Sequence, residues 1–460
     1  MLTYELKKSP GLPLYESLYR CIRWDILSGK LPAGEKLPSK RALAAHLEVS
    51  KITVETAYSQ LLAEGYIRSR EKVGYFVEAL EHAAPTAPAL PPHREAPAAP
   101  ALDLTGGGSQ GFPFSVWSRL QREVMLDYGE KLLLPLPNTG VAELRQAIAA
   151  HLAAFRGMRV EAENILIGAG TDFLYNLLIQ LLGRDKIYAV EEPGYGKIRQ
   201  IYSAGDVACV SAPLDGEGVM VEGLSADVLH ISPNHHFPTG LVTPLSRRKT
   251  IVSWANSGSR WIIEDDYDSE FRFHAHPMPT LRSLDGGQRV IYMNSFSKTL
   301  APSIRISYMV LPRELMAKFQ QKLGFYSCTV PSFEQYTLSQ FLSRGYFEKH
   351  INRMRKIYKN RRNQVISLLE NWEYSDKITI LEQDAGLHFL LRVDTPLSDD
   401  AATAALAARG IRVNALSGYY HGDPGEENRH CLVINYAHLD PAVFEKMLTH
   451  FSCLFDTGQI

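Results

Sequence analysis

Hydrophobic and polar positions in the first 78 residues follow first the period of helices and then that of strands. A first helix is predicted over 14–27, ending at Ser28-Gly29, because apolar residues recur there at helical spacing: Leu14, Leu18, Ile22 and Ile26. Ser39 and Ser50 are good N-caps for a second helix over 40–47 and a third from 51 to about 64. Residues 66–77 hold two β-prone runs around a charged turn, which favours a hairpin. Three helices and a hairpin predict a winged helix-turn-helix.

In a winged helix-turn-helix the third helix lies in the major groove of DNA, with polar and basic side chains near its start. Four side chains here have that placement: Ser50, Lys51, Thr53 and Thr56. Arg41 on the second helix is a further candidate contact, and the predicted wing carries Arg68, Arg70 and Lys72. Each of these charges taken alone is more often a solvated surface residue, so the order of the elements carries the prediction.

Residues 79–101 separate this unit from the rest of the chain. The segment is dominated by Ala and Pro and has no usable apolar periodicity. Proline lacks the N–H that helices and strands need, so we expect a semi-rigid, extended linker. The sequence thus predicts a DNA-binding domain over 1–78, a linker over 79–101 and a large domain over 102–460, with a small C-terminal subdomain over about 335–460.

Composition indicates a globular protein rather than a disordered or membrane-spanning one. Apolar residues make up 45% and charged residues 22% of the 460 positions. The formal net charge is -1, but residues 1–78 carry 12 basic against 9 acidic side chains, a modest excess that permits DNA binding. The five cysteines are scattered and predict reduced thiols. Without a signal-peptide pattern or a long apolar run, we expect a cytoplasmic protein and no membrane partner.

The large domain contains a lysine surrounded by hydroxyl side chains. Lys298 follows the apolar strand 290–293 and is preceded by Ser295 and Ser297, while Arg305 comes seven residues later. A buried amine with a lowered pKa forms a Schiff base with a carbonyl cofactor, and serines and arginine bind a phosphate. An isolated S-x-S-K would more often be a surface loop.

Two further segments match the needs of such a cofactor. The strand 261–264 leads into Asp265 and Asp266, and either carboxylate could stand beside a pyridine nitrogen; an exposed acidic turn or a metal site is the alternative. Gly170 and Thr171 start a helix after a strand, where free N–H groups bind phosphate. Tyr195, after the strand 187–190, could stack on the ring.

The N-terminal unit resembles the GntR family. The resemblance covers nearly all of residues 11–78 and is carried by LPAGEKLPSKRALAAHLEVSKITVETAYSQLLAEGYI. It implies that Arg41 and Lys51 contact double-stranded operator DNA and that Ser39 caps the helix before the recognition helix.

Residues 102–455 resemble fold-type-I pyridoxal-phosphate enzymes, specifically the α/β aminotransferase-like domain of MocR regulators. The motifs EEPGY, SPNHHFPTG, IIEDDYDSEF and SFSKTLAPSIR occur in the family's order. The resemblance implies pyridoxal 5'-phosphate on Lys298, Asp265 rather than Asp266 at the pyridine nitrogen, and Tyr267 at the phenol oxygen. It also implies a homodimer with the DNA-binding unit of one subunit over the large domain of the other.

The chain departs from this family where aminotransferases bind a substrate carboxylate. In LVINYA, Val433 stands in place of the expected arginine, and Lys197 stands where some relatives have a second one. Arg412 and Arg429 are possible substitutes. Phe237 replaces an asparagine of classical aminotransferases, as in MocR proteins, and two neighbouring histidines, His235 and His236, could contact the cofactor's phenolate region. His274 and His276 have metal-like spacing, but no carboxylate pattern accompanies them, and we expect no metal.

The resulting hypothesis is a transcription regulator in which pyridoxal phosphate, with or without a small amino-compound effector, shifts the arrangement of the DNA-binding units, in vitamin B6 or amino-acid metabolism. Val433 favours sensing over turnover. Two alternatives stay open: a working aminotransferase carrying a regulatory DNA-binding head, and a DNA-binding protein whose large domain only dimerises.

Overall fold

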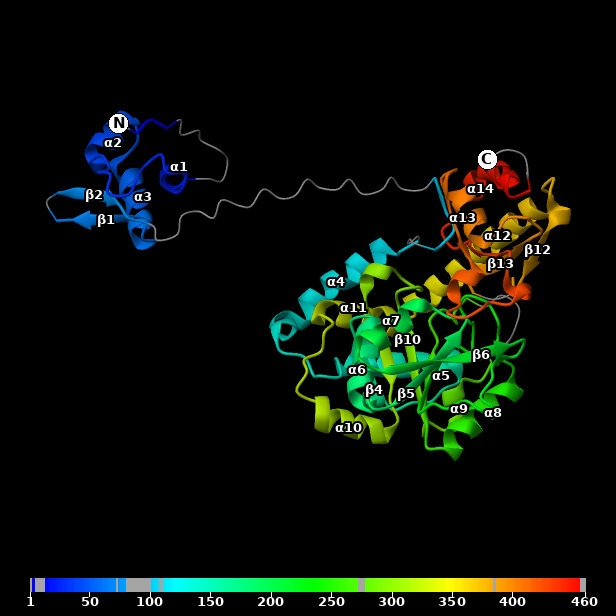
Figure 1. The fold of residues 1–460 in the computed structure, drawn as a ribbon. Helices are drawn as coiled ribbons and strands as arrows, with labels where there is room; N and C mark the ends of the chain where they lie inside the picture. The colour runs from blue at the N-terminus through cyan, green and yellow to red at the C-terminus, as the bar shows by residue number, and fades with distance from the viewer. Residues whose placement is uncertain are drawn as a thin grey trace. The chain divides into compact units, whose positions relative to one another are not determined.

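The computed structural model describes residues 2–4, 13–71, 73–79, 101–106, 111–271, 278–383 and 386–455. The predicted linker over 79–101 lies almost wholly outside this part, as do Lys72, His274 and His276. The chain divides into two compact units, Met1–Ala98 and Ala99–Ile460. Figure 1 shows the first unit in blue and the second from cyan to red. Within the described residues, no helix is both long and apolar enough to cross a membrane.

The first unit has the predicted order of three helices and a hairpin: α1 (Leu14–Leu27), α2 (Lys40–His46), α3 (Lys51–Ala63), β1 (Ile67–Arg70) and β2 (Gly74–Val77). Ser39 and Ser50 act as the predicted N-caps, since their hydroxyls accept from the N–H groups of Ala42 at 3.2 Å and Thr53 at 3.1 Å. The apolar face of α1 is buried against α3 in one core, which includes Leu18, Ile22, Val54, Tyr58 and Leu61. The periodicity of the sequence therefore describes this unit well.

The second unit is built on a mixed eight-stranded sheet in the order β4-β11-β10-β9-β8-β5-β6-β7. The strands are, in that order, Ile165–Gly168, Ser307–Val310, Val290–Ser295, Trp261–Asp265, Val228–Ile231, Ile187–Glu192, Ala208–Asp215 and Gly218–Val219. The five strands from β10 to β6 are mutually parallel, whereas β11 is antiparallel to both β10 and β4. Carboxyl ends of the parallel strands therefore meet at one edge of the sheet.

Helices cover both faces of this sheet, because alternate residues of its strands point to opposite sides. One face packs on α6 (Thr171–Leu182), α7 (Gly196–Ala204) and α10 (Arg313–Leu323). The other packs on further helices, namely α4 (Phe114–Tyr128), α5 (Ala142–Arg156), α8 (Leu245–Ser257), α9 (Leu281–Asp285), α11 (Ser332–Ser343) and α12 (Tyr346–Glu370). This is the predicted α/β architecture, with helices on both sides of a buried sheet.

A smaller sheet follows α12, in the order β12-β13-β16-β15. Its strands are Ile378–Leu381, His388–Val393, Cys431–Asn435 and Asn414–Ala415, accompanied by α13 (Asp399–Ala407) and α14 (Pro441–Leu448). Beside it, β3 (Leu102–Asp103) pairs in parallel with β14 (Ile411–Arg412). The start of the large unit thus joins the C-terminal subdomain, a pairing that local sequence patterns did not predict.

Candidate cofactor site

The candidate site lies at the carboxyl ends of β9 and β10, and Asp265 is its best-defined carboxylate. Asp265 is buried at the end of β9 and accepts a hydrogen bond from the hydroxyl of Tyr175, on α6. The Nε2 atom of His230 lies 3.6 Å from Asp265 Oδ2. The other oxygen, Asp265 Oδ1, is buried and has no hydrogen-bond partner. A buried acceptor without a donor is costly, so this atom fits a protonated ring nitrogen.

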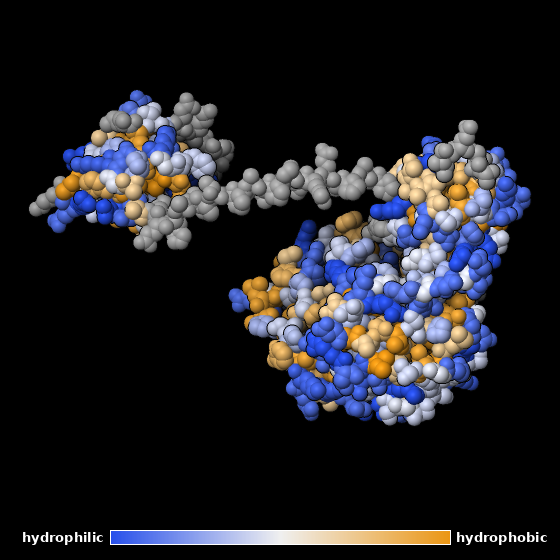
Figure 2. Space-filling model, viewed as in Figure 1, coloured by the Kyte–Doolittle hydropathy of each residue, from blue (hydrophilic) through white to orange (hydrophobic). Residues whose placement is uncertain are grey.

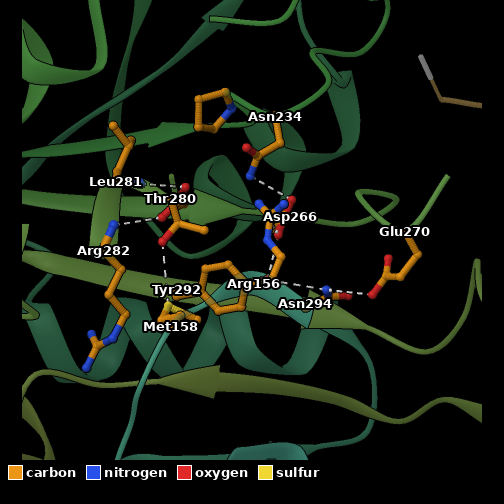
Figure 3. Close-up of polar contacts among 12 residues, drawn as sticks. Arg156, Met158, Asn234, Asp266, Glu270, Thr280, Leu281, Arg282, Tyr292 and Asn294 are labelled. Carbon is orange, nitrogen blue, oxygen red and sulfur yellow. Dashed lines mark hydrogen bonds and ion pairs between the residues drawn. The ribbon is translucent and has the colours of Figure 1, made fainter. Parts of the chain in front are cut away.

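Asp266 faces the opposite side of the sheet. Its Oδ2 lies 3.0 Å from Nη2 of Arg156, the last residue of α5, and both side chains are at most 1% exposed. The Nδ2 of Asn234 donates to Asp266 at 2.7 Å, and the hydroxyl of Tyr292 donates at 2.5 Å. Figure 3 shows these side chains converging on Asp266. Since Asp266 is occupied by this structural network, the geometry supports Asp265 as the ring partner.

A candidate phosphate-binding site, called the cup below, lies where β10, β11 and β4 align; it comprises Gly170, Thr171, Ser295, Ser297 and Arg305. Ser295 of β10 pairs with Ser307 of β11, which pairs with Gly168 of β4. Arg305, two residues before Ser307, packs directly on Gly170: a Cβ atom built on this glycine would lie 2.2 Å from Arg305 Nη2. Gly170 also has φ of 93°, which glycine tolerates best. The strand register therefore brings the predicted phosphate residues of two distant segments together.

Hydroxyl groups line the same end of the sheet. Ser295 Oγ donates to Ser297 Oγ at 3.0 Å and accepts from the N–H of Ser297 at 3.1 Å. Thr171 is the first residue of α6, whose N-terminus has no side-chain cap. Hydroxyls, free N–H groups and a guanidinium together form the donor set that a phosphate monoester requires.

Asp172 is an acidic residue at this cup that the sequence analysis did not single out. Its Oδ2 lies 3.3 Å from Arg305 Nη2 and 2.7 Å from Nζ of Lys197, on α7. These hydrogen bonds and charges hold the pKa of Asp172 below its usual range despite the opposing effect of burial. Lys197, expected near a substrate carboxylate, is therefore paired with an acid of the protein itself.

Lys298 stands in the turn that follows β10, and its side chain is exposed. The expectation of a buried amine is wrong for this chain, because the turn carries the residue beyond the end of the strand. Burial, with a contribution from the Lys298 charge, lowers the pKa of His438 to about 4. Burial, with contributions from the neighbouring histidines and from the Lys298 charge, lowers the pKa of His388 well below its usual value. Both histidines therefore stay neutral beside the lysine.

The half-buried Tyr267 and the buried His235 form a second pair of side chains. The hydroxyl of Tyr267 lies 3.3 Å from His235 Nδ1, and that nitrogen lies 2.8 Å from Asp268 Oδ2. Burial and the nearby carboxylates raise the pKa of Tyr267 above its ordinary value, so the phenol keeps its proton. His236 instead contacts Thr239 and Glu191. A protonated phenol can donate to a cofactor oxygen, as predicted for Tyr267.

Aromatic side chains surround Val433, the residue predicted to stand in place of a carboxylate-binding arginine. Val433 lies in β16 and is buried within an apolar cluster to which Phe237 and Tyr419 belong. Phe237 makes edge-on contacts with three rings, Tyr195, Tyr419 and His388, at centroid distances of 5.9, 5.2 and 5.2 Å. Tyr195 is 51% exposed.

The two candidate substitute arginines are both ion-paired within the protein. Arg429 pairs with Glu426 and Asp423, and Arg412 pairs with Asp103, so each is bound to an acid of its own surface. Neither guanidinium is left unpaired for a substrate carboxylate. The ion-pair partners of Arg412 and Arg429 depend on how loops pack, which the local sequence does not predict.

Sequence reasoning missed Tyr175, the hydrogen-bond donor to Asp265. It lies four residues after Thr171 on α6, and residues with this spacing share a helix face. That spacing could have placed Tyr175 at the site. Nothing comparable pointed to His230 or Arg156, whose positions depend on the packing of distant segments.

Comparisons with known proteins agree with both units. Residues 14–77 match the family described as bacterial regulatory proteins, gntR family. The whole chain is 32% identical to the probable rhizopine catabolism regulatory protein MocR of Rhizobium meliloti, over 98% of this chain and 95% of the relative. It is 31% identical to the pyridoxine biosynthesis regulator PdxR of Corynebacterium glutamicum, over 88% of each. It is 36% identical to the uncharacterized regulator YhdI of Bacillus subtilis, over 91% of each.

Solved structures share the fold of the large unit. An archaeal alanine:glyoxylate aminotransferase covers 77% of this chain and 90% of its own, with a TM-score of 0.67 and 23% identity. LysN, an α-aminoadipate aminotransferase from Thermus thermophilus, covers 77% and 91%, with a TM-score of 0.66 and 23% identity.

A winged helix-turn-helix and an aminotransferase fold in one chain define a class of transcriptional regulators with an aminotransferase-like domain. This chain belongs to that class, as a member of the MocR-type regulators of the GntR family.

Proposed function

We propose that this regulator binds pyridoxal 5'-phosphate in its large unit and that occupancy controls how the winged-helix unit binds operator DNA. The observation that carries the proposal is the position of Asp265, Arg305 and Lys298 at the same end of the neighbouring strands β9, β10 and β11. Asp265 has an unpartnered buried oxygen, and Arg305 packs on a glycine where a Cβ would collide. The residues present therefore fit the cofactor.

Each residue has a distinct part in this proposal. Arg305, Ser295, Ser297, Gly170 and Thr171 would hold the phosphate, and Tyr195 would cover the ring. Asp265 would keep the ring nitrogen protonated, while the protonated Tyr267 would donate to the phenol oxygen. When bound, pyridoxal phosphate supplies an aldehyde that the Lys298 amine can hold covalently, together with a chromophore that reports the link.

Control of DNA binding requires that the cofactor bind the DNA-competent and incompetent states of the protein unequally. PdxR is named for pyridoxine biosynthesis, which supports vitamin B6 as the signal here. The aromatic wall around Val433 supports sensing over transamination. In the same proposal, an amino-compound effector would bind beside the cofactor.

A homodimer is part of the proposal. Large apolar side chains are exposed along α4 and the segments beside it, including Phe114, Leu126, Leu133 and Phe325 at 76 to 78%. In Figure 2 hydrophobic residues gather where α4 ends. Exposed apolar patches of this kind mark association surfaces. Sedimentation of the full chain measures the stoichiometry, and a monomer at micromolar concentration would contradict the dimer.

The test is the absorbance spectrum of the full chain titrated with pyridoxal phosphate, followed by borohydride reduction and mapping of the modified lysine. We expect a visible band and a modification on Lys298, both lost in Lys298→Ala. A matched control is Lys322→Ala, on α10, which should leave the band unchanged. No band in the wild type, or the same band in Lys298→Ala, contradicts the proposal, and steady turnover of common amino donors would favour an active aminotransferase.

A further inference from the structure

A second cavity lies at the opposite end of the sheet from Lys298. It has a volume of about 510 Å³ and is lined by residues that precede β4 and β10 and follow β11, among them Asn164, Gln288, Arg289 and Pro312. Lys298 follows the other end of β10, which spans six residues, or roughly 20 Å at the usual rise of a strand. The two sites are therefore separated by the length of the sheet.

Four arginines from separate segments line this cavity: Arg159 after α5, Arg282 on α9, Arg289 before β10 and Arg313 at the start of α10. Two acids, Glu161 and Glu314, share the lining. None of the four guanidinium groups is ion-paired with a carboxylate of the described residues. With four arginines against two glutamates, the cavity lining has an excess of positive charge.

Arg282 is the buried member of this set and is only 7% exposed. Its guanidinium donates to three backbone carbonyls, those of Val290 at 2.6 Å, Val310 at 3.1 Å and Leu311 at 3.3 Å. In Figure 3 its side chain extends away from the buried Asp266 network. Burial lowers the pKa of Arg282 to about 10. The charges of Asp285 and Glu264 partly offset this effect, and an anion placed in the cavity would stabilise the guanidinium further.

Two backbone features border the arginines of the cavity. Gly286 and Gly287 have φ of 69° and 78°, and a Cβ on Gly287 would lie 3.2 Å from Arg282 Nη2. Helix α10, eleven residues long, starts at Arg313 with no side-chain cap. Its first N–H groups belong to residues of the cavity lining and add positive partial charge.

We propose that this cavity binds a small phosphorylated molecule at a second site, distinct from the candidate cofactor site. The volume suits a small-molecule ligand, and several guanidinium groups with a helix N-terminus suit phosphate oxygens, which accept bidentate hydrogen bonds. The inference rests on the cavity alone and holds whether or not Lys298 carries pyridoxal phosphate.

The test uses isothermal titration calorimetry of the full chain with inorganic pyrophosphate, in an Arg305→Ala background that disables the candidate cofactor cup. The double variant Arg159→Glu with Arg313→Glu changes two exposed side chains and should weaken pyrophosphate binding by about tenfold or more. The matched control is Arg184→Glu with Arg409→Glu, two exposed arginines outside the cavity, which should bind like the background.

Four outcomes would overturn the proposal. The first is no heat of binding with pyrophosphate, and the second is equal binding of pyrophosphate after charge reversal in the cavity. Citrate that binds as tightly as pyrophosphate, with the same dependence on Arg159 and Arg313, would indicate a polycarboxylate site. A short non-operator duplex whose binding requires these arginines, while that of pyrophosphate does not, would indicate a nucleic-acid surface. Circular dichroism of each variant separates loss of binding from loss of folding.

Discussion

Asp265 and Asp266 are neighbours in the sequence with different surroundings. The side chain of Asp265 lies with Tyr175 and His230, whereas Asp266 is paired with Arg156 among residues that are almost fully buried. Removing one member of a buried ion pair leaves the other charge without compensation. The two carboxylates should therefore respond differently to the same substitution.

We predict that Asp266→Asn lowers the free energy of unfolding by about 3 kcal/mol or more, because Arg156 loses its counter-ion. Asp265→Asn should cost less stability, since its nearest basic group is a histidine at 3.6 Å, but should weaken pyridoxal phosphate binding. Denaturant unfolding and cofactor titration measure the two effects. If Asp266→Asn alone abolished cofactor binding in a fully folded protein, the roles of the two residues would be reversed.

At the scale of elements, we predict that the start of α3 faces the DNA backbone. Ser50 caps the helix and also contacts the hydroxyl of Thr53 at 2.8 Å, which leaves the exposed Lys51 side chain free of the cap. Arg41 on α2 is exposed as well. The DNA contacts of all these residues, Ser39 included, stay predictions.

Lys51→Ala should weaken DNA binding and reduce the slope of log K against log salt by about 0.9, the value for one lost phosphate contact. Fluorescence anisotropy with a duplex at several salt concentrations measures the slope. Arg20→Ala is the control, because Arg20 lies on α1 with 61% of its side chain exposed and pairs with Glu16. An unchanged slope in Lys51→Ala would remove this residue from the DNA interface.

For the large unit as a whole, buried acids predict how stability changes with pH. Burial raises the pKa of Glu191 to about 8, and burial with nearby carboxylate charge raises those of Glu264 and Glu270 to about 7. Above the usual pKa of a glutamate, these side chains keep their protons in the folded protein, whereas the unfolded chain has already released them. The free energy of unfolding therefore falls as the pH rises from that value towards the raised pKa. Buried histidines such as His236, with a pKa of about 3, act in the opposite sense only below pH 6.5.

Between pH 6.5 and 8 the free energy of unfolding should therefore decrease, by about 1–2 kcal/mol from Glu191. Glu191→Gln should flatten this dependence, whereas Glu163→Gln, at an exposed position, should not. Urea unfolding at the two pH values provides the measurement. The same slope in wild type and Glu191→Gln would show that Glu191 is ionised in the folded protein.

The sequence by itself determined the winged helix, the α/β class of the large unit and the segments that carry the candidate site. Helical periodicity, capping serines and strand-ending motifs depend only on residues close together in the chain. They can therefore be recognised without the tertiary structure. The apolar runs of β10 and β9 likewise place Lys298 just beyond one strand and Asp265 at the end of the other.

The tertiary structure decided which of these segments meet. Arg305 packs on Gly170 because β11 lies between β10 and β4, and Tyr175 reaches Asp265 because α6 covers that face of the sheet. The pairing of β3 with β14, the exposure of Lys298 and the surface pairing of Arg412 and Arg429 also depend on contacts between residues far apart in the chain. Such contacts follow from packing of the whole unit, which no local pattern encodes.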